Sequence, residues 1–481
     1  MSITNNEMNF NNLEKEILKL CFKIGCEEIK SVLEKWDKEL CQARDKIIYR
    51  NKGKRKTVIK TVMGEVEYFR TMYEIKSEDG TIKRLYLLDE AMGIKGSGHM
   101  SELFSNMITK AVCESPYREA ARSISELTGQ TISHTAAWNV AQEVGNHIEK
   151  QENEKAKLAE NNSGKGEIGT KVLFEEQDGI YINLQGEDRK KYGKSKEMKV
   201  GIAYDGAEET YVKSKAKKKR YKLTNKVACA NFENVKNFQK RKEGIIANVY
   251  NVNEIEMRFL NGDGANWIKN SIVDDTVHFQ LDPFHRNKAV KTYVKNPEMQ
   301  ENIMEMLHNN DIDNLLVYIE ALSNSVETDE ENGGEEKQNL LELLKYFTNN
   351  KDGLVPFNQR KIKICEPPDG KEYRNMGCME SNIFTIIGNR MKGRRACWSL
   401  NGGNNLARLL CLKHTGKLAD VMQNLTTVTL PEKYADEIIV KLSSSKIVKS
   451  VGKGFDGYHK TSAPSTSNYK WLRNMGAIQS L

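Results

Sequence analysis

The stretch from Phe259 to Val290, FLNGDGANWIKNSIVDDTVHFQLDPFHRNKAV, sets the organisation of the chain. Its pattern predicts a strand that ends in Asn-Gly-Asp-Gly, a short helix, a second strand with alternating apolar residues, and a helix opened by Asp-Pro-Phe-His. Because sites in open α/β sheets lie outside the carboxyl ends of the strands, Asp263, Asp282 and His285 are expected to converge there. The alternative is that both aspartates only form turns or cap helices, as Asp beside Gly or Pro commonly does.

A further carboxylate lies upstream, in residues 171–185, KVLFEEQDGIYINLQ. Alternation of apolar residues predicts a strand in which Asp178 is on the apolar face, whereas Gln177 and Tyr181 are on the face expected to be solvated. A carboxylate on an apolar face is unfavourable unless it is paired or coordinates a cation. The alternative is a partly exposed hairpin end with a bulge at Gly179.

A third carboxylate opens the segment 377–410, GCMESNIFTIIGNRMKGRRACWSLNGGNNLARLL. The spacing predicts a helix on which Glu380, Phe384, Ile387 and Met391 form one stripe facing the core. A glutamate in a first helical turn is also favoured by the helix dipole, although that does not explain its place on the stripe. Basic residues interrupted by Trp398 follow and have the form of a phosphate-contacting surface: Arg390, Lys392, Arg394, Arg395 and Arg408.

Asp178, Asp263 and Glu380 together suggest a site for two divalent cations, Mg²⁺ or Mn²⁺. Hard cations of this kind take oxygen ligands. Two such ions about 3.5–4 Å apart can clamp the attacking and leaving oxygens of an in-line phosphoryl displacement. The three carboxylates therefore indicate phosphoryl-transfer chemistry.

These segments resemble DDE transposases with a ribonuclease-H-like core, and they are most similar to the ISLre-two insertion-sequence family. The most specific parts are EEQDGIYINLQ, NGDGANWIK, DPFHRNKAV and ESNIFTIIGNRMKGRRACWS. The resemblance implies that Asp178, Asp263 and Glu380 are the first, second and third catalytic acids. The sequence departs from the family pattern in having Glu175 and Glu176 just before Asp178, so three acids are candidates for the first catalytic position.

The resemblance also implies a relation to the Mutator-type group. In that group a Cys or Asp, followed after two residues by His, lies between the second and third acids. Residues 282–285, Asp-Pro-Phe-His, fit that pattern. We expect His285 to position the scissile phosphate with its ring oriented by Asp282, whereas metal ligation is less expected because Mg²⁺ prefers oxygen.

A helix-turn-helix is predicted before the catalytic segments. A helix over residues 117–128 precedes a glycine turn, and Ser133 then occupies the N-cap of a second helix. Such a second helix would enter a DNA major groove, with His134 and Asn139 reading bases and Trp138 in the core. A bundle of packing helices would produce the same pattern.

A run of basic residues, KSKAKKKRYK, covers residues 213–222 and includes Lys217, Lys218, Lys219 and Arg220. Like charges in a block repel one another and are most favourable beside phosphates. A solvated loop is the equal alternative. Nearer the N-terminus, apolar spacing over residues 12–43 predicts an amphipathic helix, which either packs on its own chain or binds a partner.

Bulk properties limit the class of protein. The 481 residues can form several cores, and lysine plus arginine exceed aspartate plus glutamate by 74 − 66 = 8. Nine cysteines without a C-x-x-C pair indicate reduced thiols. No signal peptide and no run of ~20 apolar residues is recognisable, so a cytoplasmic protein without a membrane span is expected.

The expected fold class is α/β, in the sense of a multidomain α+β protein with a ribonuclease-H-like mixed-sheet core. The expected regions are an N-terminal helix and small β unit (1–99), a helix-turn-helix (100–150), a linker (151–169), the core (170–291 and 377–430), an all-α insertion between its parts (292–376), and a C-terminal tail (431–481).

The sequence thus predicts a DNA transposase that uses two Mg²⁺ or Mn²⁺ ions. Its expected partners are double-stranded DNA, as element ends and target, and further copies of itself on that DNA. Two alternatives stay open. One is a DNA-binding regulator with an inert ribonuclease-H-like domain, and the other is a structure-selective nuclease.

Overall fold

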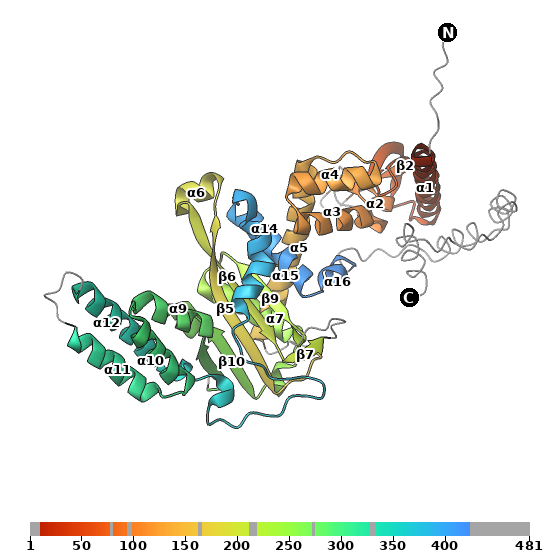
Figure 1. The fold of residues 1–481 in the computed structure, drawn as a ribbon. Coiled ribbons are helices and arrows are strands. Elements are labelled where there is room, and N and C mark those ends of the chain that lie inside the picture. The colour runs from red at the N-terminus through yellow and green to blue at the C-terminus, as the bar shows by residue number, and fades with distance from the viewer. Residues whose placement is uncertain are drawn as a thin grey trace, which may run out of the picture. The chain divides into compact units, whose positions relative to one another are not determined.

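The structure is a computed structural model that describes residues 10–76, 80–93, 99–161, 166–210, 219–271, 275–326 and 333–423. The expected C-terminal tail lies outside the described residues. Among those described, one compact unit contains residues 10–26, 58–67 and most of 99–423, and a second contains residues 27–57 and 68–93. Figure 1 shows the elements of this mixed α and β fold.

A mixed five-stranded sheet forms the centre of the first unit, with the order β11-β10-β5-β6-β9. Its strands are β5 (Val172–Asn183), β6 (Ser195–Tyr204), β9 (Val227–Asn231), β10 (Met257–Gly262) and β11 (Val277–Leu281). β5, β6 and β9 are antiparallel neighbours, whereas β10 runs parallel to both β5 and β11. The parallel pairing brings the carboxyl ends of β10 and β11 to one edge of the sheet.

The central strand β5 is buried on both faces over most of its length, which corrects the predicted alternation. Gln177, expected on a solvated face, is fully buried, and its Oε1 accepts a hydrogen bond of 2.9 Å from Gln239. Only near the far end does Tyr181 become exposed. Helix α7 (Val235–Ala247) provides Gln239, so a helix covers the face that the sequence pattern assigned to solvent.

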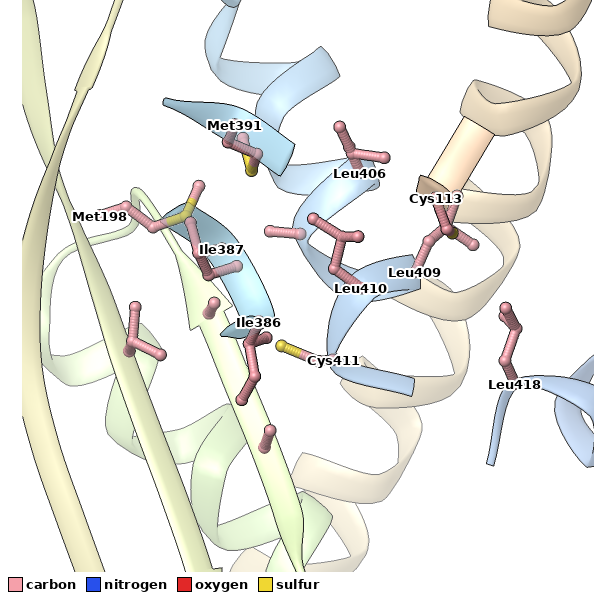
Figure 2. Packing of buried hydrophobic residues seen from close by; sticks show 14 of the residues in the cluster. Cys113, Met198, Ile386, Ile387, Met391, Leu406, Leu409, Leu410, Cys411 and Leu418 are labelled. Atoms are coloured by element: carbon pink, nitrogen blue, oxygen red, sulfur yellow. The ribbon is translucent and has the colours of Figure 1, made fainter. Parts of the chain in front are cut away.

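Helices pack against this sheet to form the main hydrophobic core. They include α3 (Glu102–Glu114), α5 (His134–Glu160) and α15 (Leu400–His414). Figure 2 shows Leu406, Leu409 and Leu410 of α15 in this core, with Ile386 and Ile387 between them and the sheet. Helices that precede the sheet strands in sequence (α3 and α5) and a helix that follows them (α15) therefore share one core with the sheet.

Four helices build a second core beside β10 and β11. They are α9 (Pro283–Tyr293), α10 (Pro297–His308), α11 (Ile312–Ser325) and α12 (Gly333–Asn349), and Figure 1 shows α10, α11 and α12 side by side. The region predicted to be an all-α insertion (292–376) thus contains the helices α10, α11 and α12. The acidic loop before α12 lies partly outside the described residues.

The predicted helix-turn-helix segment contains α4 (Tyr117–Thr128) and α5. Gly129 ends α4 in the left-handed region, with φ of 66°, and the Ser133 hydroxyl caps α5 by accepting from the amide of Ala136. α5 continues to Glu160 and so occupies the first part of the predicted linker. Trp138, expected in the core, is 42% exposed, because the buried stripe of α5 runs through Ala137 and Val140 instead.

The amphipathic helix predicted for residues 12–43 is confirmed as α1 (Phe10–Ala43). Its second half is anchored by Leu33 and Trp36, which are buried, and by Asp37, whose carboxylate accepts from the amide and hydroxyl of Thr71. The strands of this region are β1 (Arg50–Lys60), β2 (Glu65–Lys76), β3 (Ile82–Tyr86) and β4 (His99–Met100). β2 pairs antiparallel with β3, and β1 pairs parallel with β4.

The remaining elements are short. They are α2 (Leu87–Ala91), α6 (Gly186–Tyr192), β7 (Ala207–Thr210), β8 (Arg220–Leu223), α8 (Asn266–Lys269), α13 (Met379–Ile383), a π-helical turn η4 (Phe384–Gly388), α14 (Asn389–Met391), α16 (Leu418–Gln423), and the 3₁₀ turns η1 (Val252–Glu254), η2 (Lys351–Gly353), η3 (Phe357–Gln359) and η5 (Gly393–Arg395). No helix among the described residues is long and apolar enough to cross a membrane.

Candidate metal-binding site

Strand register places three aspartates at one level of the sheet. Asn261 of β10 is the register partner of both Glu176 and Gln280. The residues two positions further along these three strands are the aspartates Asp178, Asp263 and Asp282. Since side chains two apart point to the same face of a strand, the pairing itself aligns these carboxylates at the sheet edge.

A small acidic pocket lies at this edge. Its lining residues are Gln177, Asp178, Asp263, Asp282, His285, Met379 and Glu380. The potential ligand atoms of Asp178, His285 and Glu380 all lie within 4.8 Å of one another. The three acids that the sequence singles out therefore line one pocket, together with the predicted histidine.

The three neighbouring acids of β5, Glu175, Glu176 and Asp178, have different surroundings. Glu175 points to the opposite face, where it pairs with Lys242 and accepts 2.6 Å from Nε of Arg258. Glu176 is fully buried. Of the three, only Asp178 lines the acidic pocket.

Glu176 is the centre of a buried hydrogen-bond network beneath the pocket. Its carboxylate accepts five hydrogen bonds, whose donors are the amides of Gly377 and Met379 at 3.1 and 3.0 Å, Cys378 Sγ at 3.0 Å, Tyr204 Oη at 2.7 Å and Asn261 Nδ2 at 3.1 Å. Two of these donors are backbone amides just before Glu380. Glu176 therefore joins β5 to the start of α13, where Glu380 lies.

Asp263 is held by the backbone around it. Its Oδ1 accepts 2.8 Å from the amide of Ala265, and the hydroxyl of Tyr346 on α12 donates 2.8 Å to its carbonyl oxygen. Gly264 has φ of 87°, and a Cβ there would lie 2.5 Å from Oδ1 of Asn350, so the turn requires glycine. Burial, with a smaller effect of Asp178, raises the pKa of Asp263.

Asp282 caps α9 and does not orient the His285 ring, which corrects the expected pairing. Oδ1 of Asp282 accepts from the amides of Phe284 and His285 at 2.8 and 3.3 Å, and Oδ2 accepts 2.6 Å from Asn261. The His285 ring instead lies against Asp178, with Nε2 3.3 Å from Oδ2. This hydrogen bond to Asp178 raises the pKa of His285.

Glu380 is exposed at the start of α13, and the predicted stripe of four residues is wrong. Phe384 is 63% exposed, whereas Ile387 and Met391 are buried. The π-helical turn η4 follows α13 and inserts extra backbone per turn, so the residues on either side of it do not share one face. Glu380 reaches the pocket from the helix end rather than from a core-facing stripe.

Not all of the residues predicted to contact phosphates are exposed. Lys392, Arg394 and Arg395 are exposed, and both arginines adopt left-handed backbone angles, with φ of 55° and 56°. Arg390 is half-buried, donates 2.8 Å to the carbonyl of Val112, and lies over the rings of Tyr117 and Trp398.

Arg408 was also expected on the phosphate-contacting surface, and this expectation is wrong. The side chain is buried and pairs with Glu149 at 2.7 Å and Glu152 at 3.1 Å. Both glutamates belong to α5, so Arg408 joins α15 to that helix. Arg408 lies among the buried apolar residues of α15, so its side chain does not reach the surface. The prediction rested on the number of basic residues in the segment and did not consider their apolar neighbours.

The other predicted DNA contacts are exposed where they are described. His134 and Asn139 are exposed on the first turns of α5. Lys219 and Arg220 are exposed beside β8, and Lys219 pairs with Glu209 at 2.7 Å. Lys217 and Lys218 lie outside the described residues.

The fold and pocket define an α+β protein with a carboxylate-rich candidate metal site. Residues 3–424 match the model of the uncharacterised protein family UPF0236, and the chain belongs to that family. A UPF0236 protein of Caldanaerobacter subterraneus subsp. tengcongensis is 26% identical over 428 residues, which is 87% of this chain and 81% of the relative.

Two further proteins are similar to the chain. Another protein of the same Caldanaerobacter strain, whose name joins eleven locus designations, is 25% identical over 93% of this chain and 88% of its own length. The UPF0236 protein in the vanSb 3′ region of Streptococcus gallolyticus is 21% identical over 85% of this chain and 84% of its own length. Among solved structures, the Drosophila P element transposase strand transfer complex matches with 11% identity and a TM-score of 0.23, covering 69% of this chain and 83% of that chain.

Proposed function

We propose that this chain is a DNA transposase with a ribonuclease-H-like core, which cleaves and joins DNA strands with two Mg²⁺ or Mn²⁺ ions. The observation that carries the proposal is the pocket at the edge of the sheet. Asp178, Asp263 and Glu380 come from three separate segments of the chain and line that one pocket with His285. The potential ligand atoms of Asp178, His285 and Glu380 also lie within 4.8 Å of one another. Such convergence of acids is what two-ion phosphoryl transfer needs.

The donor set fits hard divalent cations. Asp178, Asp263 and Glu380 offer carboxylate oxygens, which are the ligands that Mg²⁺ and Mn²⁺ prefer. When bound, the two ions would activate a water or a DNA 3′-hydroxyl and stabilise the leaving oxygen. His285, held against Asp178, would position the scissile phosphate, and the Glu176 network would keep Glu380 facing Asp178.

The fold and the relatives support the same proposal. Three antiparallel strands extended by two parallel ones are compatible with a ribonuclease-H-like sheet. One relative carries a name that joins eleven loci, which is the distribution that a transposing element leaves in a genome. This chain would then act in the bacterial cytoplasm, on double-stranded DNA and as a homo-oligomer.

DNA recognition would use surfaces away from the pocket. The exposed first turns of α5, with His134 and Asn139, would read the element ends. The exposed basic residues Lys219, Arg220, Lys392, Arg394 and Arg395 would contact phosphates. Lys217 and Lys218, which lie outside the described residues, would do the same as part of the basic run. Arg390 would hold α3 and α4, which pack against the reading helix α5, through its contacts with Val112 and Tyr117.

The test uses purified protein, Mg²⁺ or Mn²⁺, and DNA that carries the ends of the element encoding the chain. We expect strand cleavage at those ends and joining to a second DNA, with random DNA of equal length left intact. Equal cutting of both DNAs would indicate a structure-selective nuclease. Specific binding without any cleavage in either metal would indicate a regulator.

A further inference from the structure

The first half of α1 exposes a row of large apolar side chains. Phe10, Leu13, Ile17, Leu20 and Ile24 are each between 42% and 73% exposed. They are separated by three, four, three and four residues, which is the spacing of a and d positions in a heptad repeat. We refer to these five residues as the seam.

The residue types in the seam select a particular kind of partner. With Phe10 at position a, the isoleucines Ile17 and Ile24 also fall at a, and the leucines Leu13 and Leu20 fall at d. β-branched residues at a with leucine at d favour parallel coiled coils of two strands. The seam therefore has the residue pattern of a helix that pairs with an identical helix.

A second apolar stripe of α1 already packs on the chain itself. It runs through Ile29, Leu33 and Trp36, which are partly or fully buried. At 3.6 residues per turn, this stripe lies on nearly the opposite face of the helix from the seam. The helix thus has one face for its own chain and another, displaced toward the N-terminus, that faces solvent.

We propose that the seam forms a parallel two-stranded coiled coil with the α1 helix of a second copy of this chain. The helix is already formed and anchored through Leu33, Trp36 and Asp37, so dimerisation does not bear the cost of helix nucleation. A seam of little more than two heptads gives a weak dimer in isolation. Binding of both protomers to one DNA then strengthens it through a raised effective concentration.

This inference names the surface behind the homo-oligomer of the proposed function, and its test needs neither DNA nor metal. Sedimentation of the full chain across a concentration series measures the dimer dissociation constant. Leu20→Lys or Ile17→Asn should weaken the dimer at least about tenfold, because each removes apolar surface from the interface in both protomers. A failure here leaves the cleavage assay unaffected, so the two proposals fail separately.

Leu18→Lys is the matched control. Leu18 is 49% exposed, close to the 56% of Leu20, but it points away from the seam on the same helix. Circular dichroism checks that all variants keep their helix content. Equal dissociation constants for Leu18→Lys and Leu20→Lys, or a wild-type chain that stays monomeric up to ~100 μM, would overturn the proposal.

Cross-linking tests the direction of the two helices. In a parallel pair, the two copies of residue 20 face each other, so Leu20→Cys in a Cys21→Ser background should form a disulfide-linked dimer under mild oxidation. The Cys21→Ser protein alone should form none. Failure of Leu20→Cys to cross-link above that background would exclude the parallel pair. The seam would then be covered by an antiparallel copy or by another segment of the same chain.

Discussion

Nε2 of His285 on α9 lies 3.3 Å from Oδ2 of Asp178 on β5, which joins two elements across the acidic pocket. In His285→Gln we expect DNA strand cleavage to slow by up to about a hundredfold, because the phosphate and the Asp178 carboxylate lose their positioning partner. The dependence on Mg²⁺ concentration and the thermal stability should stay as in the wild type. Cleavage at the wild-type rate would remove His285 from the mechanism.

Glu176 and Glu175 are adjacent buried glutamates on opposite faces of β5, and they offer a matched pair. Glu176→Gln should weaken Mn²⁺ binding at least about tenfold. The NH₂ group of the amide cannot accept from Tyr204 Oη and Cys378 Sγ as the Oε1 atom does, and a neutral amide oxygen accepts more weakly from the Gly377 and Met379 amides than a carboxylate oxygen. Mn²⁺ electron paramagnetic resonance without DNA measures this affinity.

Glu175→Gln should instead reduce the free energy of unfolding by about 3–5 kcal/mol, since it breaks a buried pairing with Lys242 and Arg258. Its Mn²⁺ affinity should match that of the wild type. Equal Mn²⁺ affinities in the two variants would show that Glu176 does not position the site.

Glu243 makes stability depend on pH. Partial burial alone would raise its pKa, but Lys242 and Arg258 outweigh this effect and hold the pKa at about 2, below the ordinary 4.5. Because the folded-state pKa is the lower one, this stabilisation is complete above the unfolded pKa and is lost as the pH falls toward 2. Urea unfolding between about pH 5 and pH 2 should show a shallower loss of stability in Glu243→Gln than in the wild type. Parallel pH profiles would refute this role.

The exposed basic residues predict how DNA binding responds to salt. Neutralising Arg394 and Arg395 should lower the slope of log affinity against log salt by about one unit for each phosphate that the protein no longer neutralises, for element ends and random DNA alike. Arg390→Gln should leave that slope unchanged and lower the melting temperature, because its side chain contacts Val112 and Tyr117. Filter binding at several salt concentrations measures the slopes. An unchanged slope in the double variant would show that Arg394 and Arg395 do not contact phosphates and are only solvated.

Much of the site could be predicted from the sequence, because several of its residues lie at or just beyond the ends of strands. The residue pattern of the stretch 259–290 located β10 and β11, and strands that end at one edge bring Asp263 and Asp282 together. The partner of His285 was missed, because Asp178 is distant in sequence and only the pairing of β5 with β10 brings it near.

The helical errors have local causes. A π-helical turn at 384–388 has no recognisable sequence signal here, so the regular spacing wrongly placed Phe384 in the core. Trp138 and Arg408 were assigned by residue type, whereas tertiary packing exposes the tryptophan and buries the arginine in ion pairs. The sequence could not show that Glu176 is buried and accepts hydrogen bonds from the segment before Glu380, because two other acids lie close to it in the same strand.

In the proposed transposase, Asp178, Asp263 and Glu380 would hold the metal ions needed for DNA cleavage. The most direct measurement is the rate of strand cleavage at the element ends in Mn²⁺ for Asp178→Asn, Asp263→Asn and Glu380→Gln, with DNA affinity determined on the same samples. Each variant should lose cleavage by at least about a thousandfold while binding the ends nearly as tightly as the wild type, since removal of a metal ligand disables the displacement but spares distant phosphate contacts. Cleavage at an undiminished rate in any one of the three would contradict this assignment of the metal ligands.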